Sequence, residues 1–281
     1  MKTSVLPARN AAYFPIPAAP FFLGARYREY PPCPELSPFI RCFWEADYSK
    51  EYTPSPVIPD TCADVLFFAD SSSLRTSFCG VNDGPFSPNK GSVSGRVYAI
   101  RFYAWAVSLF SGESLEDSVN LCCEAEAFFP GLVRELVPVL KNSPALWIPA
   151  SEKWLYDSLQ IHSEDARMMN TVYSVLKHEG RVSLADMAAE GVLSPRQLQR
   201  IFQREMGLSP KKFSQLVRYQ SLWRASLLPG FQVLDAVERF GDTDQSHLLR
   251  EFRRFHGLPL SQAREYALGN VAFLQDPSPV L

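Results

Sequence analysis

Apolar residues recur at helical spacing in two stretches of the chain that begin fifty residues apart, 193–207 (LSPRQLQRIFQREMG) and 243–257 (TDQSHLLREFRRFHG). Each stretch holds a leucine and a phenylalanine four positions apart: Leu198 and Phe202, then Leu248 and Phe252. Residues four apart lie on one face of a helix, so each stretch is expected to bury one apolar stripe. The sequence therefore predicts two short helices built on the same pattern.

Both stretches also carry the residues that begin and end helices. The first opens with Ser194 before a proline and stops at Gly207. The second opens with Thr243 and Asp244 and stops at Gly257. Side-chain oxygens at the start satisfy free backbone N–H groups, and glycine adopts the left-handed conformation that ends many helices.

A shorter apolar helix and a glycine precede each stretch. Residues 183–190 lead to Gly191, and residues 233–240 lead to Gly241. A supporting helix, a tight turn and a second helix make a helix-turn-helix, in which the second helix enters the major groove of DNA. An amphipathic helix is expected over 213–228 between the two units. The sequence thus predicts two reading helices in successive major grooves, about 34 Å apart.

This carboxyl-terminal part resembles the DNA-binding domain of the AraC/XylS family of bacterial transcription regulators. The residues that carry the resemblance lie in both units and between them: Leu184, Met187, Ala188, Leu193, Ser194, Pro195, Arg196, Leu198, Arg200, Phe202, Gly207, Ser209, Pro210, Arg218, Gly241, Asp244, Gln245, Ser246, His247, Arg250, Phe252, Arg253, Arg254 and Gly257. The resemblance implies a one-component regulator whose partner is promoter DNA, with RNA polymerase as a further candidate. Departures at Asp242, at Pro259-Leu260 and at Glu238-Arg239 suggest that the first unit contributes more to specificity.

Polar residues on the face opposite the apolar stripe are the candidate DNA contacts. Those expected to read bases are Arg196, Gln199, Arg200 and Gln203 in the first unit and Gln245, Ser246 and Arg250 in the second. Arginine pairs with guanine and glutamine with adenine in the major groove. Lys211 and Lys212 are candidate phosphate contacts, with an exposed lysine pair as the alternative. The resemblance implies a buried Arg218 in an ion pair, for which Asp186 is the candidate partner.

Between residues 27 and 109, short apolar runs alternate with turn residues, which is typical of β-strands. Strands are expected over 40–46, 64–68, 76–80 and 97–103, as a small barrel or sandwich. Helices follow from residue 104 to residue 160, with breaks at Pro130, Pro138 and Pro144. The fold class is therefore α+β multidomain, with a β-rich domain followed by an all-α domain.

The expected organisation has five parts: a proline-containing arm over 1–25, a β-rich sensing or dimerisation domain with helices over 26–160, a linker over 161–169, the double helix-turn-helix domain over 170–268 and a tail over 269–281. Charge follows this division. Residues 166–281 hold 15 Lys+Arg and 11 Asp+Glu, a net charge of +4, while the rest of the chain has a net charge of −6. A basic carboxyl-terminal part suits contact with phosphates.

The amino-terminal part resembles, more weakly, the sensing domain of one branch of the same family, through Tyr30-Pro31, Leu36, Trp44, Pro59-Asp60, Leu66-Phe67-Phe68, Gly80 and Arg101-Phe102. The resemblance implies a small-molecule effector or a homodimer. Candidate ligand residues are Trp44, Arg101, Tyr103 and Trp105, with ordinary strand packing as the alternative. A second hypothesis is a regulator whose first domain binds a protein partner, with DNA binding secondary. An enclosed apolar pocket would favour an effector, and a flat apolar patch would favour a partner.

Other functions lack support in the sequence. There is no GxSxG, HExxH or Gly-rich phosphate loop, so no enzyme, catalytic residue or cofactor is expected. The six cysteines, Cys33, Cys42, Cys62, Cys79, Cys122 and Cys123, form no CxxC pair and are expected as reduced thiols that bind no metal. Prolines interrupt the apolar stretch over 11–24, so no membrane span and a cytoplasmic location are expected.

Overall fold

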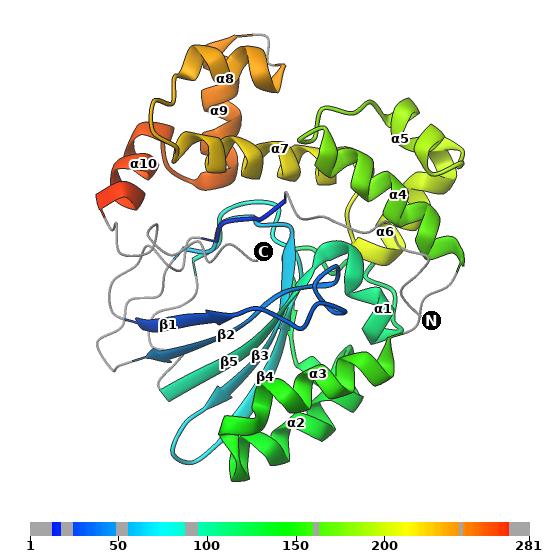
Figure 1. Cartoon of the computed structure of the whole chain (residues 1–281), viewed down its shortest axis with the longest axis vertical. Helices are drawn as coiled ribbons and strands as arrows, with labels where there is room; N and C mark the ends of the chain where they lie inside the picture. The colour runs from blue at the N-terminus through cyan, green and yellow to red at the C-terminus, as the bar shows by residue number, and fades with distance from the viewer. Residues whose placement is uncertain are drawn as a thin grey trace.

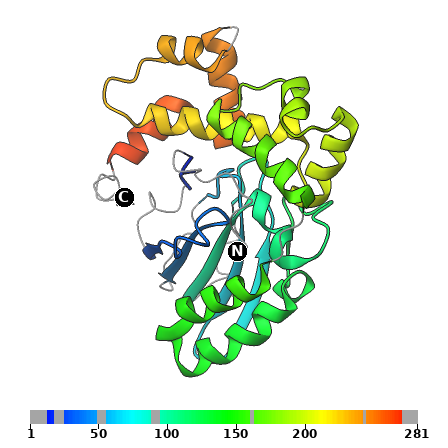
Figure 2. The same ribbon diagram turned by 45° about the vertical axis from the view of Figure 1, so that its right-hand side comes forward.

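The computed structural model of the chain describes residues 13–17, 25–48, 56–87, 95–159, 163–241 and 244–269. Figure 1 shows a sheet domain in the lower part of the molecule and a layer of helices above it. Turning the molecule by 45° keeps the two layers apart in view, with the upper helices lying across the end of the sheet domain (Figure 2). The expected order, a β-rich domain followed by an all-α domain, is confirmed.

The described strands form one antiparallel sheet in the order β1-β2-β5-β3-β4-β6. Their bounds are β1 Ala25–Tyr30, β2 Ile40–Tyr48, β3 Cys62–Ala69, β4 Leu74–Cys79, β5 Gly95–Tyr103 and β6 Cys122–Cys123. The four expected strands match β2 to β5. The strands β1 and β6 lie at the two ends of the sheet and were not predicted, because their short sequences carry little periodicity.

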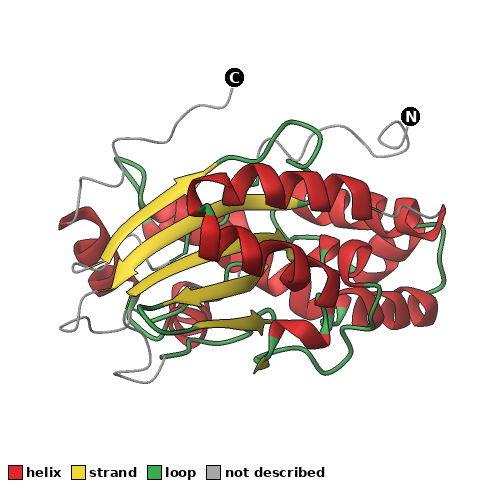
Figure 3. Ribbon diagram, turned by 90° about the horizontal axis from the view of Figure 1, so that it is seen from below, coloured by secondary structure: helices red, strands yellow, loops and turns green. Residues whose placement is uncertain are grey.

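The central strand β5 is buried on both faces from Val97 onward. On one face the helices α2 (Pro130–Asn142) and α3 (Trp147–Ser158) cover the sheet (Figure 3). The Trp147 ring of α3 meets the rings of Phe43 and Tyr98 at 5.6 and 5.5 Å. Such edge contacts between aromatic rings add to the burial of apolar surface.

The expected helix break at Pro138 is wrong. Pro130 begins α2, a position where its missing N–H costs nothing, but Pro138 lies inside the same helix. The helix continues because its apolar face, which includes Leu132, Leu136 and Leu140, is buried against the sheet domain, while Pro138 itself is exposed. Short helices flank it: η2 Ala104–Ala106, α1 Ser108–Ser111, η3 Ala125–Ala127 and η4 Pro144–Leu146.

The upper layer holds α4 (Ser163–Lys177), α5 (Leu184–Glu190), α6 (Pro195–Met206), α7 (Pro210–Ser226), α8 (Val233–Phe240), α9 (Gln245–His256) and α10 (Leu260–Gly269). Helix α4 begins inside the expected linker, 161–169, of which 163–169 are helical. Here the apolar Met168 and Met169 are buried in the core, so packing extends the helix backward. Among the described residues, no helix combines the length and the apolar character needed to cross a membrane.

Cys79 and Cys122 form a disulfide, with their Cα atoms 4.3 Å apart. The expectation that all six cysteines are reduced is therefore wrong for this pair, while Cys33, Cys42, Cys62 and Cys123 are free. The two cysteines meet because β4 and β6 pair with Cys79 directly opposite Cys122. A spacing of 43 residues gives no local signal for this pairing.

Candidate nucleic-acid interface

The first reading helix, α6, begins and ends where the sequence predicts. The Ser194 side chain accepts a hydrogen bond from the backbone N–H of Gln197, and the Gln197 side chain accepts one from the N–H of Ser194. Pro195 takes the first helical position, and Gly207 ends the helix with a φ of 70°. This reciprocal capping fixes the start of the helix that is expected to meet DNA.

The second reading helix, α9, has an equivalent start and end. The Asp244 carboxylate accepts a hydrogen bond from the backbone N–H of His247 at 2.8 Å. Gly257 ends the helix with a φ of 82°. The other expected starting residue, Thr243, lies outside the described residues. Both helices therefore have defined ends, set by local chemistry.

Each reading helix is anchored through its apolar stripe. Leu198, Phe202, Leu248 and Phe252 are at most 2% exposed. Phe202 packs edge-on against Phe213 of α7, with ring centroids 5.8 Å apart, and Phe252 lies 5.9 Å from the ring of Trp223, also in α7. Both helices are thus held by the same connecting helix, and the polar face of each is turned outward.

Most of the predicted base-reading side chains are exposed on these outward faces. They are Arg196, Gln199 and Arg200 on α6 and Gln245, Ser246 and Arg250 on α9. Gln203 differs, because it is half-buried and its amide donates to the carbonyl of Gly207 at 2.9 Å. In this conformation Gln203 closes the end of its own helix.

The turn in the first unit uses its glycine in an unexpected way. Gly191 has an ordinary φ of −80°, and the left-handed residue is its neighbour Val192, with a φ of 51°. A Cβ atom on Gly191 would lie only 2.6 Å from the Thr171 hydroxyl oxygen in α4. Glycine is therefore needed here for close packing of α5 against α4, whereas Gly241 in the second unit has a left-handed φ of 66°.

The two candidate phosphate contacts have different surroundings. Lys211 is exposed at the start of α7. The Lys212 ammonium lies 2.9 Å from the carboxylate of Asp83, in the loop after β4. Hydrogen bonds from Asn120 and from Lys212 lower the pKa of Asp83. In this conformation Lys212 is therefore paired with the sheet domain and is not free to act as a phosphate contact. Its partner Asp83 was not predicted from the sequence.

Further contacts dock the first unit on the sheet domain. The backbone N–H of Leu115 donates to the carbonyl of Arg204, near the end of α6, at 2.7 Å. The Trp105 ring meets Phe213 edge-on at 6.1 Å. The buried amide of Gln220 in α7 donates to the carbonyl of Pro59. Trp105 and Pro59 were named from the sequence for other reasons, and nothing in the sequence marks any of these positions as a contact between the domains.

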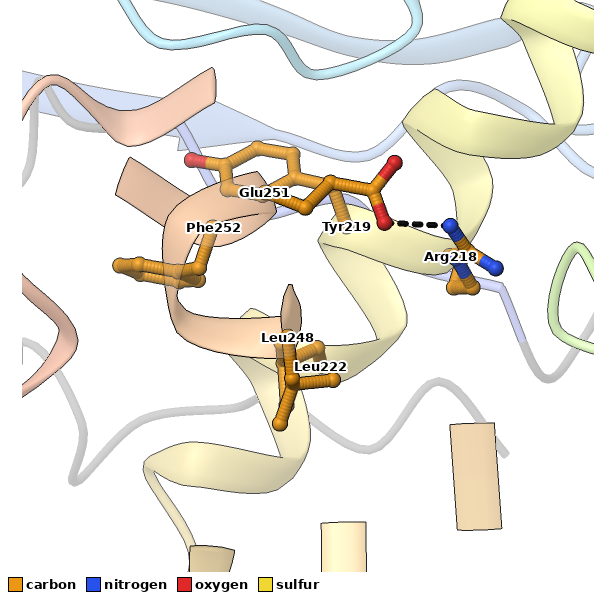
Figure 4. A pocket seen from close by; sticks show the side chains of 6 residues that line it. All are labelled: Arg218, Tyr219, Leu222, Leu248, Glu251 and Phe252. Carbon is orange, nitrogen blue, oxygen red and sulfur yellow. Dashed lines mark hydrogen bonds and ion pairs between the residues drawn. The ribbon is translucent and has the colours of Figure 1, made fainter. Parts of the chain in front are cut away.

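The second reading helix is tied to α7 by polar contacts as well as by packing. Figure 4 shows the Arg218 guanidinium pointing at the carboxylate of Glu251, with which it forms an ion pair, beside a hollow of about 10 Å³. The expected ion pair of Arg218 exists, but the partner is Glu251 and not Asp186. Asp186 instead accepts a hydrogen bond from the hydroxyl of Ser183 at the start of its own helix.

A buried histidine completes this attachment. The Tyr219 hydroxyl lies 2.9 Å from Nδ1 of His256, and the His256 ring stacks on Phe252 with centroids 4.9 Å apart. Burial lowers the pKa of His256 to about 4, so the imidazole is neutral near pH 7. Burial also raises the pKa of Tyr219.

The four candidate ligand residues fall into two separate groups. Trp44 and Arg101 share one partner: the indole Nε1 donates to Asp64 at 2.9 Å, and the guanidinium donates to the same carboxylate. Arg101 also lies 3.4 Å from Asp60, whose pKa burial raises to about 6. These two side chains are occupied by contacts within the sheet.

Tyr103 and Trp105 form the other group. Their rings stack with centroids 4.4 Å apart, and Trp105 donates to the carbonyl of Pro38 at 3.1 Å. Because Trp105 also meets Phe213, this group belongs to the contact between the domains. The structure therefore does not bring the four candidates together in one pocket.

A larger cleft of about 470 Å³ lies where the arm meets the helical layer. Tyr13 and Phe14 line it from the arm. The other lining residues come from α4, α7 and α8 and from the loops that follow α4 and α7: Tyr173, Leu176, Lys177, Glu179, Gln220, Ser221, Arg224, Ala225, Leu228 and Arg239. Across it, Arg239 of α8 pairs with Glu179 beyond the end of α4. The cleft thus touches the arm, α4, the connecting helix α7 and α8 of the second helix-turn-helix unit.

Two family models match this chain. Residues 187–266 match a helix-turn-helix domain, and residues 28–124 match a domain of unknown function, DUF6597. Comparison with curated proteins gives no match. The helix-turn-helix match covers most of the helical layer, from within α5 to within α10, and the DUF6597 match covers the sheet from within β1 to β6.

Among solved structures, the chain is similar to a probable AraC family regulator from Rhodopseudomonas palustris, with 24% identity, a TM-score of 0.31, and coverage of 36% of this chain and 96% of that one. An AraC-type regulator from Chromobacterium violaceum is 18% identical, with a TM-score of 0.34, and the match covers 36% of this chain and 92% of that one. Fatty-acid-bound ToxT from Vibrio cholerae is 14% identical, with a TM-score of 0.41, and the match covers 78% of this chain and 91% of that one.

Two helix-turn-helix units on one connecting helix, each presenting an exposed arginine, define a DNA-binding regulator rather than an enzyme. The matched helix-turn-helix domain over residues 187–266 supports this class. A β-rich domain that matches DUF6597 over residues 28–124 precedes it in the chain.

Proposed function

We propose that α6 and α9 read two adjacent major grooves of double-stranded promoter DNA. The observation that carries this proposal is the duplication: two capped helices, anchored through matching apolar pairs on α7, each leave an arginine exposed at the equivalent position. A rigid connecting helix keeps two reading helices at a fixed separation, as reading one turn of DNA requires.

The proposed roles follow from exposure and chemistry. Arg200 and Arg250 each read a guanine, and Arg196, Gln199, Gln245 and Ser246 add contacts on the same faces. Lys211 binds phosphate and so fixes register without reading sequence. Gln203 reads a base only after it releases the end of α6.

We also propose that a small organic effector controls this reading from the cleft between the arm and the helical layer. The volume of about 470 Å³ lies in the range of small-molecule sites. A ligand there would contact α4, α7 and α8 together, and so would bias how the two units are held. This arrangement favours an effector over a protein partner or a homodimer as the controlling input.

Selection of bound fragments from a random DNA library tests the reading proposal, using the full chain and the variants Arg200→Ala and Arg250→Ala. We expect two boxes about one helical turn apart, each degraded by its own variant, at a cost of about 1–3 kcal/mol per lost contact. Arg134→Ala, which removes an exposed arginine from α2, is the control and should change neither box. Equal losses on selected and random DNA for Arg200→Ala would contradict base reading.

The effector proposal is tested by measuring thermal unfolding of the full chain against a library of small organic compounds. A compound that binds the cleft should stabilise the wild type and lose its effect in Ser221→Trp, whose added ring would fill the space. Stabilisation that survives this substitution would place the effector elsewhere. Stabilisation by a copurified protein alone would favour the partner hypothesis.

A further inference from the structure

The disulfide between Cys79 and Cys122 joins the last residue of β4 to the first residue of β6, a strand of only two residues. Cys79 is half-buried and Cys122 is exposed, so small reagents in solution can reach the pair. Disulfides in proteins that work in a reducing cell interior are usually transient and redox-sensing. An accessible disulfide in a DNA-binding regulator therefore needs a functional account.

The disulfide anchors one end of the segment 112–121, which connects α1 to β6. On the sheet side, the N–H of Gly80 donates to the carbonyl of Leu121, and the N–H of Asn120 donates to the carbonyl of Val81, both at 2.9 Å. These contacts all lie within a few residues of Cys79 or Cys122. The covalent bond and the short pairing thus act at the same place.

The same segment contacts the C-terminal end of the first reading helix, α6. Leu115 donates its N–H to the carbonyl of Arg204. A Cβ atom on Gly207 would lie 2.7 Å from the carbonyl oxygen of Leu115 and 2.8 Å from the hydroxyl oxygen of Ser118. The C-terminal end of α6 therefore rests directly on a segment whose base is the disulfide.

We propose that Cys79 and Cys122 are a reversible thiol–disulfide modification site whose state sets how firmly the first reading helix is docked on the sheet domain. In the oxidised chain, described here, the segment 112–121 is fixed and α6 is held through Leu115 and Gly207. In the reduced chain, only the two-residue pairing of β6 and the hydrogen bonds of Leu121 and Asn120 fix the base of the segment, so the docking loosens.

The oxidant is a two-electron acceptor of the peroxide class. The thiolate of the exposed Cys122 attacks one peroxide oxygen, the O–O bond breaks, and a sulfenic acid forms as hydroxide leaves. The Cys79 thiolate then attacks the sulfenic sulfur, the S–S bond forms and a second hydroxide leaves. The two thiols lose two electrons and two protons, and one hydrogen peroxide becomes two waters. A dithiol reductant returns the pair to thiols by exchange.

The neighbouring Cys123 is not part of this site. Adjacent residues on a strand point to opposite faces, so Cys123 faces away from the side on which Cys122 meets Cys79. It pairs in register with Phe78 instead. Cys123 is therefore the matched control for experiments on the pair.

The consequence for DNA rests on the proposed function. Docking holds the end of α6, and it also keeps Lys212 on Asp83, because Asp83 exchanges hydrogen bonds with Asn120 of the same segment. Reduction should therefore free the first unit to adjust to DNA, and the reduced chain should bind its two-box site more tightly than the oxidised chain.

The test uses the full chain treated with hydrogen peroxide or with dithiothreitol, and the variants Cys79→Ser, Cys122→Ser and Cys123→Ser. Peptide mass spectrometry reports the linkage, and hydrogen exchange without DNA reports docking at 112–121 and 204–213. In the wild type and in Cys123→Ser we expect a Cys79–Cys122 link and exchange about fivefold slower after oxidation. Cys79→Ser and Cys122→Ser should show neither, and affinity for selected DNA should be about threefold higher in the reduced wild type.

Three results would overturn the proposal or part of it. Linkage of other cysteines would overturn the assigned pair, and equal exchange in both states would overturn its effect on docking. Redox-dependent exchange with unchanged DNA affinity would overturn the control of DNA binding alone. If no DNA sequence is enriched in either state, the proposed reading function fails, while the exchange measurement still decides the modification site.

Discussion

The two helix-turn-helix units share one motif but are attached to the molecule in different ways. The first reading helix ends on the sheet domain, through Leu115 and Arg204, and its neighbour Phe213 packs against Trp105 of that domain. The second is held by α7, through the pair of Arg218 with Glu251 and a buried aromatic cluster. It meets the sheet domain at Gly257, beside Pro85.

Although both units are proposed to read DNA, this difference means that they respond to the sheet domain in different ways. A unit whose orientation depends on another domain can respond to that domain, whereas a unit fixed to the connecting helix follows that helix. The contacts at Lys212, Trp105 and Gln220 all join the sheet domain to the first unit or to α7. Signals from the amino-terminal part therefore reach the first unit directly and the second through α7.

The largest expected effect comes from removing the anchor of one unit. Phe252→Ala should cost about 3–5 kcal/mol, because it removes a fully buried ring from the cluster around Trp223 and leaves a cavity. Hydrogen exchange under increasing urea should show α8 and α9 losing protection while α5 and α6 keep theirs, since the sheet domain supports the first unit.

The matching variant Phe202→Ala sharpens the comparison. It should loosen α6 together with the segment around Leu115, because the two are in contact. Leu234→Ala, at a position 71% exposed, is the control and should change the free energy of unfolding by less than about 0.5 kcal/mol. Simultaneous loss of both units in Phe252→Ala would contradict separate attachment.

A pH dependence that arises from His256 in the second unit is the next effect. The pKa of His256 is lowered by burial to about 4, from an ordinary value of 6.5. Between these values the unfolded chain binds a proton on this imidazole that the folded chain does not bind. The contribution of His256 to stability is therefore complete above pH 6.5 and falls as pH decreases toward 4, by about 3 kcal/mol in total.

Urea denaturation from pH 7.5 to pH 4.5 measures this loss. His256→Gln should be less stable than wild type at pH 7 but should have a flatter pH profile. His247→Gln, which changes an exposed histidine of the same helix, should keep the wild-type profile. An unchanged slope in His256→Gln would show that another group titrates.

Local chemistry explains which features could be predicted from the sequence. The ends of α6 and α9 depend on Ser194, Asp244 and two glycines within one helical turn, and the apolar pairs depend on spacing alone. The helix ends and the apolar pairs could therefore be predicted from this sequence alone. The same holds for the four longer strands, whose runs of apolar residues lie between clear turns.

Partners that come from distant parts of the chain could not be predicted in this way. Arg218 was expected to pair with Asp186 but meets Glu251, because the packing of α9 on α7 decides which carboxylate arrives. Lys212 has the sequence of a phosphate contact, and only the tertiary fold brings Asp83 to it. Cys79 and Cys122 likewise meet through strand pairing.

The smallest expected effect tests whether the first unit must release the sheet domain to bind DNA. Asp83→Asn removes the charge that holds the Lys212 ammonium while keeping a side chain of the same size. A partly exposed ion pair contributes at most about 1 kcal/mol, so the change in DNA affinity should be about two- to fivefold. Affinity should rise, because Lys212 becomes available to phosphate.

The salt dependence of binding separates this mechanism from a general increase in positive charge. Each phosphate contact contributes about −0.9 to the slope of log affinity against log salt, so Asp83→Asn should steepen the slope by about one contact. Lys211→Ala should make it shallower by a similar amount, because Lys211 is exposed and already free to bind phosphate. The double variant Asp83→Asn with Lys212→Ala should lose the gain. A steeper slope that persists in the double variant would mean that Lys212 never reaches the backbone, and that the first unit binds DNA while still docked on the sheet domain.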